Sequence, residues 1–142
     1  MAAKGSARWQ GDLRSGSGTF SAGDGGIAGD YSFKTRFEDA PGANPEQLIA
    51  AAHASCYSMA LSNMLAEAGT PPTSVETHAT VTLRPVDGKP TITGIALRTV
   101  GVVPGIDEAR FGELAQQAKV GCPVSRALAG VAEITLDASL SS

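Results

Sequence analysis

One long helical segment constrains the fold of this chain more than any other feature. Asn44 is a favoured N-cap residue, Pro45 suits the first helical position, and Gln47 follows the cap by three residues, as in a capping box. Gly69, which is followed by two prolines, marks the end of the segment. We therefore expect a central helix over residues 44–68.

This expected helix is apolar on nearly every side. Its large apolar side chains include Leu48, Ile49, Met59 and Leu61, and half of the residues between them are alanines. A helix without a polar face must be covered all round, and a single sheet covers only one side. We therefore expect the helix to pack on its own sheet and against a second copy of itself, with the small alanines allowing close approach.

The first forty residues are typical of short strands separated by glycine turns. Apolar and polar residues alternate from Tyr31 to Glu38, which predicts a half-buried strand. Arg36 would lie on the polar face of that strand. The glycines are not followed by a Gly-Lys-Ser/Thr motif, so we interpret them as turn residues and not as a phosphate-binding loop.

Residues 74–140 are expected to form a hairpin, a second helix and a final strand. Asp87 and Gly88 form a strong two-residue turn signal between two alternating stretches. Asp107 is placed to cap the second helix, and a short further helix is expected to begin at Cys122. Because strands and helices are segregated along the chain, the expected fold class is α+β, with residues 1–142 forming a single domain.

Composition excludes several classes of partner. The 142 residues include 11 Lys and Arg against 14 Asp and Glu, without a basic stripe that would indicate nucleic acid binding. The apolar stretch 48–61 is too short and too polar to cross a bilayer, which takes roughly 20 residues. Without an N-terminal apolar segment, we expect a cytoplasmic protein. The two cysteines are then expected to be reactive, metal-binding or merely buried.

The two cysteines occupy different local settings. Cys56 lies in the middle of the apolar helix, where an apolar environment raises a thiol pKa, and a small buried hydrophobe is an equal alternative. Cys122 lies between Gly121 and Pro123 at the start of a helical turn, where free N–H groups favour the thiolate. It is either a capping residue without chemistry or a thiol suited to disulfide exchange.

Arg36 and Glu46 are two further candidates. A solvated strand face is a sufficient explanation for Arg36, and the first turn of a helix favours an acid such as Glu46. Glu46 and Cys56 are ten residues apart on the expected helix, a rise of about 15 Å. If both belong to one active site, they come from two chains.

Other chemistries are less well supported by the pattern. A zinc site would need His53, Cys56, His78 and Cys122 together, but there is no Cys-x-x-Cys and His78 falls on a polar strand face. A hydrolase that uses Cys56 and His53 is less favoured, because their i, i+3 spacing on a helix does not suit a nucleophile–base pair. His53 is better explained as a core histidine with one hydrogen bond. A dimeric binding protein with inert thiols remains open.

Five stretches together resemble a known family. Residues 44–61 resemble the helix around the peroxidatic cysteine of the OsmC/Ohr peroxiredoxin-like proteins, and residues 121–125 resemble their second-cysteine motif. Residues 35–37 resemble the strand that supplies their active-site arginine. Residues 103–107 and 132–137 resemble the OsmC branch more than the Ohr branch. The resemblance covers nearly the whole chain.

The resemblance implies an OsmC-like fold: antiparallel sheets with a long central helix and a second helix, in an intertwined homodimer with two active sites at its interface. It implies that Cys56 attacks the peroxide and that Cys122 resolves the product. Arg36, held by Glu46, would then supply the cation that keeps Cys56 ionised.

The implied function is a thiol peroxidase that reduces organic hydroperoxides to alcohols, in antioxidant defence under oxidative or osmotic stress. The reaction would pass through a Cys56 sulfenic acid and a Cys56–Cys122 disulfide, which a dithiol reductant, a lipoylated partner in this family, would reduce. It needs no metal or flavin. An apolar lining from Phe33, Phe37 and Met59 would favour an alkyl hydroperoxide over hydrogen peroxide.

Overall fold

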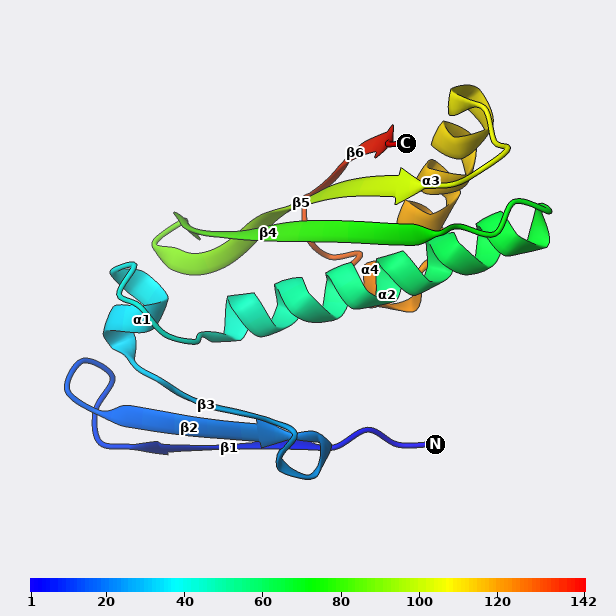
Figure 1. The fold of residues 1–142 in the computed structure, drawn as a ribbon. Helices are drawn as coiled ribbons and strands as arrows, with labels where there is room; N and C mark the ends of the chain where they lie inside the picture. The colour runs from blue at the N-terminus through cyan, green and yellow to red at the C-terminus, as the bar shows by residue number, and fades with distance from the viewer. The chain divides into compact units, whose positions relative to one another are not determined.

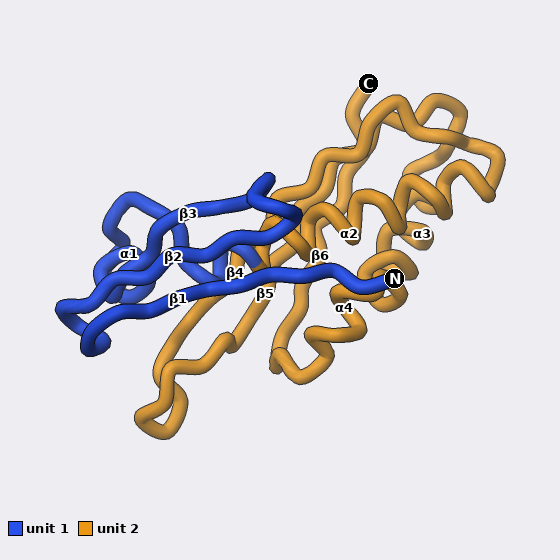
Figure 2. The backbone as a smooth tube through the Cα atoms, turned by 90° about the horizontal axis from the view of Figure 1, so that it is seen from below, with its two compact units in different colours: residues 1–48 blue, residues 49–142 orange.

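A computed structural model describes all of residues 1–142. The backbone divides into two compact units, residues 1–48 and residues 49–142, which are coloured separately in Figure 2. Each unit carries one three-stranded sheet, and the helices occupy stretches of chain apart from the strands (Figure 1). The expected α+β class is therefore confirmed.

The first unit is an antiparallel sheet of the order β1-β2-β3, followed by a one-turn helix. The elements are β1 (Gly5–Gln10), β2 (Ser17–Ala22), the 3-10 turn η1 (Gly23–Gly25), β3 (Ile27–Tyr31) and α1 (Phe33–Phe37). Gly18 pairs with Trp9 on one side and with Tyr31 on the other. A Cβ atom there would lie 2.6 Å from the Tyr31 ring and 2.7 Å from the Trp9 ring. The close packing of these two aromatic rings therefore requires glycine at position 18.

The segment around Arg36 is the helix α1, so the strand expected from Tyr31 to Glu38 is wrong beyond Tyr31. Ser32 and Thr35 form a reciprocal capping box, in which Ser32 Oγ accepts from the Thr35 N–H and Thr35 Oγ1 accepts from the Ser32 N–H. Phe33 and Phe37 pack with their ring centroids 5.0 Å apart. Residues four apart share a face in a helix as well as in a strand, so the alternation alone could not distinguish the two.

The central helix α2 (Pro45–Glu67) begins and ends as its sequence predicts. Asn44 Oδ1 accepts a hydrogen bond from the Gln47 N–H at 2.8 Å, which caps the first turn. At the other end Gly69 has a φ of 88°, and the Thr70 N–H bonds to the Leu65 carbonyl, as in a Schellman motif. The helix is therefore fixed at both ends by local hydrogen bonds.

The second unit contains the sheet β4-β5-β6. Its strands are β4 (Ser74–Val86), β5 (Lys89–Val102) and β6 (Glu133–Leu140). Asp87 and Gly88 form the expected β4–β5 turn with φ angles of 51° and 76°. β6 lies parallel to β5, so this sheet is mixed where antiparallel pairing was expected. The parallel pairing is possible because two helices, α3 (Glu108–Gly121) and α4 (Pro123–Ala127), form the long connection between the strands.

The core of the second unit lies between this sheet and its helices. On α2 it includes a line of fully buried residues four apart, Tyr57, Leu61 and Leu65. The other buried apolar residues are Ile95, Leu97, Val103, Phe111, Leu114, Ala115, Ala118 and Cys122. The hydroxyl of Tyr57 donates to the Ala115 carbonyl at 2.9 Å, which ties α2 to α3 within this core.

Another face of α2 is exposed and largely apolar. Met59 is 76% exposed and Leu48 is 36% exposed, and Ala51, Ala52 and Ser55 are also exposed. The core of the second unit therefore covers only one side of the apolar helix, and the exposed residues Leu48, Ala51, Ala52, Ser55 and Met59 define a stripe on it. This stripe is called the exposed stripe of α2 below.

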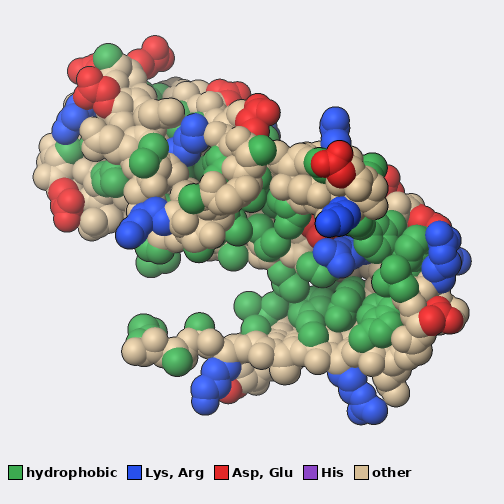
Figure 3. Space-filling model, turned by 180° about the vertical axis from the view of Figure 1, so that it is seen from behind, with side chains coloured by type: hydrophobic (Ala, Val, Ile, Leu, Met, Phe, Trp, Pro, Cys, Tyr) green, Lys and Arg blue, Asp and Glu red, His purple; other side chains and the backbone are tan.

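The surface carries mixed charge. On the face shown in Figure 3, blue basic and red acidic side chains are scattered among neutral ones, and no basic patch covers that face. None of the helices is both long enough and apolar enough to cross a membrane. These observations agree with the composition, in which acids slightly outnumber bases.

Candidate active site

Cys122 lies at the junction of two helices. It is the C-cap of α3 and the N-cap of α4, and its Sγ accepts a hydrogen bond from the Ser125 N–H at 3.3 Å. The capping role expected from the sequence is therefore confirmed. Pro123 follows at the first helical position, so the chain turns sharply at the cysteine. Cys122 is only 1% exposed.

Cys56 is a half-buried thiol on α2, close to Cys122. Burial raises the pKa of the Cys56 thiol above its ordinary value, and the Cys122 side chain, within hydrogen-bonding reach, raises it further. A hydrogen bond from the Val124 backbone lowers the pKa in the opposite direction. Both cysteines are free thiols in this structure. The second unit thus brings together two thiols that are far apart in the sequence.

A buried hydrogen-bonded chain continues from Cys122 to α2. The Cys122 thiol donates to Ser125 Oγ at 3.1 Å, and Ser125 Oγ lies 2.7 Å from His53 Nε2. His53 is completely buried, Ser125 is 6% exposed, and burial lowers the pKa of His53. His53 is thus a core histidine with one hydrogen bond, as expected, and its Nδ1 has no partner. Ser125 was not identified from the sequence, although its position three residues after Cys122 is that of a capped residue.

Arg36 and Glu46 form an ion pair in the first unit. Arg36 Nη2 donates to Glu46 Oε1 at 2.8 Å, and Arg36 Nε donates to Oε1 at 3.1 Å and to Oε2 at 3.3 Å. Glu46 is 7% exposed, whereas the Arg36 side chain is 36% exposed. The guanidinium is therefore fixed along one edge and keeps part of its surface open.

An aromatic hollow of about 410 Å³ lies beside Arg36. It belongs entirely to the first unit, and its lining residues are Trp9, Gly11, Leu13, Tyr31, Ser32, Phe33, Arg36 and Phe37. Arg36 also stacks on Phe37, with its guanidinium carbon 5.4 Å from the ring centroid. A cation at the edge of an apolar hollow suits a ligand that has a polar end and an apolar tail.

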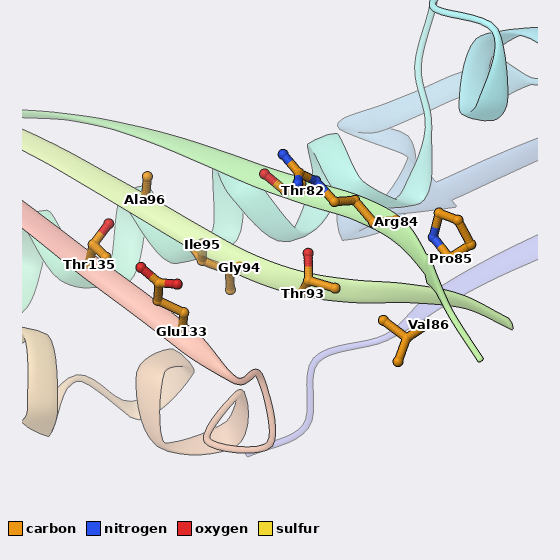
Figure 4. Close-up of a pocket in the computed structure, with 10 residues that line it drawn as sticks. All are labelled: Thr82, Arg84, Pro85, Val86, Thr93, Gly94, Ile95, Ala96, Glu133 and Thr135. Atoms are coloured by element: carbon orange, nitrogen blue, oxygen red, sulfur yellow. The ribbon is translucent and has the colours of Figure 1, made fainter. Parts of the chain in front are cut away.

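A different hollow, of about 470 Å³, lies on the sheet of the second unit (Figure 4). Its lining residues come from β4, β5 and β6, and the polar ones among them include Arg84, Glu133 and Thr135. It contains neither of the cysteines and none of the other candidates from the sequence. We therefore assign the candidate site to the thiols and not to this hollow.

The zinc alternative is not supported by the geometry. His78 is exposed and its Nε2 bonds to Glu76 at 2.9 Å, away from the thiols. No group of three or more His, Cys, Asp or Glu side chains is arranged to hold a metal ion. The hydrolase alternative is also weakened, because His53 Nε2 is engaged by Ser125 and not by Cys56.

Comparison with known proteins identifies the family of this chain. The family model for OsmC-like protein matches residues 37–137. Peroxiredoxin OsmC of Escherichia coli strain K12 is 54% identical over 140 residues, which is 98% of this chain and 96% of that protein. The chain belongs to the OsmC family. The resemblance seen in the two cysteine motifs is therefore confirmed.

More distant relatives are consistent with this assignment. An organic hydroperoxide resistance protein of Xanthomonas axonopodis pv. citri is 33% identical over 96 residues, 67% of this chain and 66% of that protein. The crystal structure of the organic hydroperoxide resistance protein OhrB of Bacillus subtilis has a TM-score of 0.72 and 27% identity, covering 99% of this chain and 98% of that one. The higher identity to the OsmC protein agrees with the branch expected from residues 103–107 and 132–137.

Proposed function

We propose that this chain is a cysteine-based peroxidase that reduces organic hydroperoxides to alcohols. Membership of the OsmC family, with relatives named as a peroxiredoxin and as an organic hydroperoxide resistance protein, supports the enzyme class and its role in stress defence. The observation that carries the proposal is the neighbouring pair of free thiols, the half-buried Cys56 and the buried Cys122.

The proposed reaction has three steps. The Cys56 thiolate attacks one oxygen of the hydroperoxide, the O–O bond breaks, and an alkoxide leaves and takes up a proton to become the alcohol. Cys56 is now a sulfenic acid, and Cys122 displaces its hydroxyl group to form a disulfide and water. A dithiol reductant, for which we propose a lipoylated protein, then returns both cysteines to thiols.

The first step needs a cation near Cys56, because burial raises the pKa of this thiol and a neutral thiol is a poor nucleophile. We propose Arg36, held in place by Glu46, as that cation. An opposite charge at ~4–6 Å lowers a pKa by about 1–3 units, which opposes the effect of burial on Cys56 and favours its thiolate. Arg36 also stabilises the departing alkoxide.

Arg36 and Glu46 are proposed to act on the Cys56 of a second copy of the chain. Glu46 and Cys56 lie ten residues apart on the continuous helix α2, which rises about 15 Å over that length. The exposed stripe of α2 supports a homodimer, because a largely apolar helix face gains free energy when it is covered. In this proposal residues 1–142 work as one domain whose active site is completed by its partner.

The aromatic hollow beside Arg36 is proposed to receive the apolar tail of the hydroperoxide. Its rings would bury an alkyl or aryl group, while Arg36 at its edge meets the polar peroxide end. We propose that the protein works in the cytoplasm, where dithiol reductants keep cysteines reduced.

The direct experiment compares the wild-type chain with Cys56→Ser in a turnover assay with cumene hydroperoxide and a dithiol reductant. The wild type should consume hydroperoxide continuously, and Cys56→Ser should consume none above the rate without protein. Consumption that persists in Cys56→Ser would exclude Cys56 as the attacking group. Equal inactivity of both proteins would favour the alternative of a dimeric module with inert thiols.

A further inference from the structure

The proposed reaction assigns no role to Ser125 and His53, two buried polar residues next to Cys122. Ser125 Oγ lies 3.1 Å from Cys122 Sγ and 2.7 Å from His53 Nε2, so the three side chains form one continuous hydrogen-bonded chain. Each of the three residues is at least nine-tenths buried. His53 is a titratable residue in a core position, and no carboxylate forms an ion pair with it.

The directions of the hydrogen bonds between Cys122, Ser125 and His53 suit the transfer of a proton from the thiol to the imidazole. The Cys122 thiol donates to Ser125 Oγ, so the hydroxyl hydrogen of Ser125 is free to point at His53 Nε2. Proton transfer along these bonds requires the neutral His53 tautomer that carries its hydrogen on the unpartnered Nδ1 and a lone pair on Nε2 facing Ser125. Burial lowers the pKa of His53, which keeps Nε2 an open proton acceptor at neutral pH.

We propose that Ser125 and His53 form a proton relay that activates Cys122 as the resolving thiol. This inference rests on the proposed peroxidase function and deepens it. In the relay, Cys122 gives its proton to Ser125 Oγ while Ser125 gives its own hydroxyl proton to His53 Nε2. Cys122 becomes a thiolate that still receives hydrogen bonds from the Ser125 hydroxyl and the Ser125 backbone N–H. Ser125 contacts the reacting sulfur, and His53 acts through Ser125.

The step balances without a further reactant. The Cys122 thiolate attacks the sulfur of the Cys56 sulfenic acid, an S–S bond forms and the S–O bond breaks. The hydroxide that leaves becomes water, and the proton held by His53 balances it, so His53 returns to neutral. Overall one sulfenic acid and one thiol give one disulfide and one water.

The relay would remove the proton of Cys122, which burial separates from bulk water. Cys122 is 1% exposed, so bulk water cannot readily take its proton when the thiolate is needed. Cys56 and Tyr57 are the titratable side chains that interact with Cys122, and Lys119 and Arg126 line a hollow together with Ser125. The Tyr57 hydroxyl donates to the Ala115 carbonyl, and burial raises its pKa, so it remains protonated and does not compete with His53.

The test measures the disulfide-forming step alone. Reduced wild type, Ser125→Ala and His53→Gln are mixed rapidly with one equivalent of cumene hydroperoxide and quenched at intervals. Mass spectrometry then follows the sulfenic acid, trapped with dimedone, and the Cys56–Cys122 disulfide. Gln can accept a hydrogen bond from Ser125 but cannot hold the proton. Ser125→Thr keeps the hydroxyl, and Ser141→Ala, which removes an exposed hydroxyl just after β6, is the matched control.

The relay predicts that all variants form the sulfenic acid at the wild-type rate. Disulfide formation should slow about 10²-fold in Ser125→Ala and His53→Gln at pH 7, with recovery in Ser125→Thr and no change in Ser141→Ala. In the two slow variants the rate should rise steeply with pH, because only the thiolate form of Cys122 reacts. In the wild type this pH dependence should be much weaker.

Two outcomes separate this inference from the proposed function. If the sulfenic acid forms but Ser125→Ala and His53→Gln give the disulfide at the wild-type rate and with the wild-type pH profile, the relay is wrong and the peroxidase stands. If no sulfenic acid forms in the wild type, the peroxidase proposal fails. Diamide, which oxidises a dithiol without peroxide, then tests the relay, and equal rates in wild type and Ser125→Ala would overturn it.

Discussion

The carboxylate of Glu46 accepts three hydrogen bonds from the guanidinium of Arg36, two from Nε and one from Nη2, at 2.8 to 3.3 Å. The pair joins α1 to the first turn of α2, two elements whose ends are set by their own capping bonds. The arginine is therefore held in one orientation before any substrate arrives, which is the preorganisation that stabilises developing charge most effectively.

The Arg36–Glu46 ion pair predicts which of two variants loses more peroxidase activity. Arg36→Ala should lower the peroxidase kcat/KM by about 10²–10³-fold, because it removes the cation proposed to stabilise the thiolate and the alkoxide. Glu46→Gln should lower kcat/KM by a smaller factor, because Arg36 remains but no longer has a carboxylate to hold it in place. Steady-state kinetics with cumene hydroperoxide measures both. The ranking is contradicted if Arg36→Ala keeps wild-type activity.

Cys122→Ser should separate peroxide reduction from turnover. This variant should consume one equivalent of hydroperoxide per chain and then stop, because the Cys56 sulfenic acid has no resolving thiol. Mass spectrometry after dimedone treatment should show one adduct on Cys56. Continued turnover at the wild-type rate would mean that Cys122 is not the resolving residue.

The exposed stripe of α2 predicts dimer formation. Met59 is 76% exposed in the single chain, so Met59→Glu should leave the fold intact but shift a dimer toward monomer and lower activity with it. Thr80→Glu places the same charge on an exposed position of β4 and is the matched control. Light scattering after size-exclusion chromatography gives the mass of each. A wild-type chain that stays monomeric would contradict the prediction.

Burial of His53 predicts a pH-dependent contribution to stability. Burial lowers the pKa of His53 in the folded chain, so the unfolded chain binds more protons between that lowered pKa and about 6.5. The free energy of unfolding should therefore fall as pH falls below about 6.5, by at most about 1.4 kcal/mol per pH unit from this residue.

Denaturant unfolding at pH 7.5, 6.5 and 5.5 measures this contribution. The carboxylates also respond to acid, so the informative quantity is the difference in pH dependence between the wild type and His53→Gln. The variant should be less stable at pH 7.5 and should lose less stability on acidification. Parallel curves for the two proteins would show that His53 does not contribute.

Leu61→Ala tests the core of the second unit. Leu61 is completely buried on α2, so the substitution should lower the free energy of unfolding by about 2–5 kcal/mol. Leu13→Ala, at a residue that is 58% exposed, is the matched control and should change it by less than about 0.5 kcal/mol. Urea denaturation monitored by circular dichroism gives both values. Equal losses would contradict the assigned core.

The elements with local signals could be predicted from the sequence. Asn44 and Gly69 mark the two ends of α2, and Asp87 and Gly88 mark the β4–β5 turn, because a cap or a left-handed turn depends on a few neighbouring residues. The role of Cys122 as a cap followed from Gly121 and Pro123 in the same way.

Features that depend on tertiary contacts could not be predicted. The helix around Arg36 is an exception, because its signal, the Ser32–Thr35 capping box, is local and was hidden by the alternation of apolar and polar residues. The parallel pairing of β6 with β5 depends on where the α3–α4 connection leads the chain. The contact of Ser125 with His53 joins residues 72 positions apart, which no local pattern predicts.

The central claim is that Cys56 and Cys122 form one redox pair that a hydroperoxide oxidises. The most direct measurement is a count of free thiols after one equivalent of cumene hydroperoxide is added to the fully reduced protein. We predict the loss of two thiols per chain and a Cys56–Cys122 disulfide in the peptide map. Two thiols remaining per chain, with the hydroperoxide unconsumed, would contradict the account.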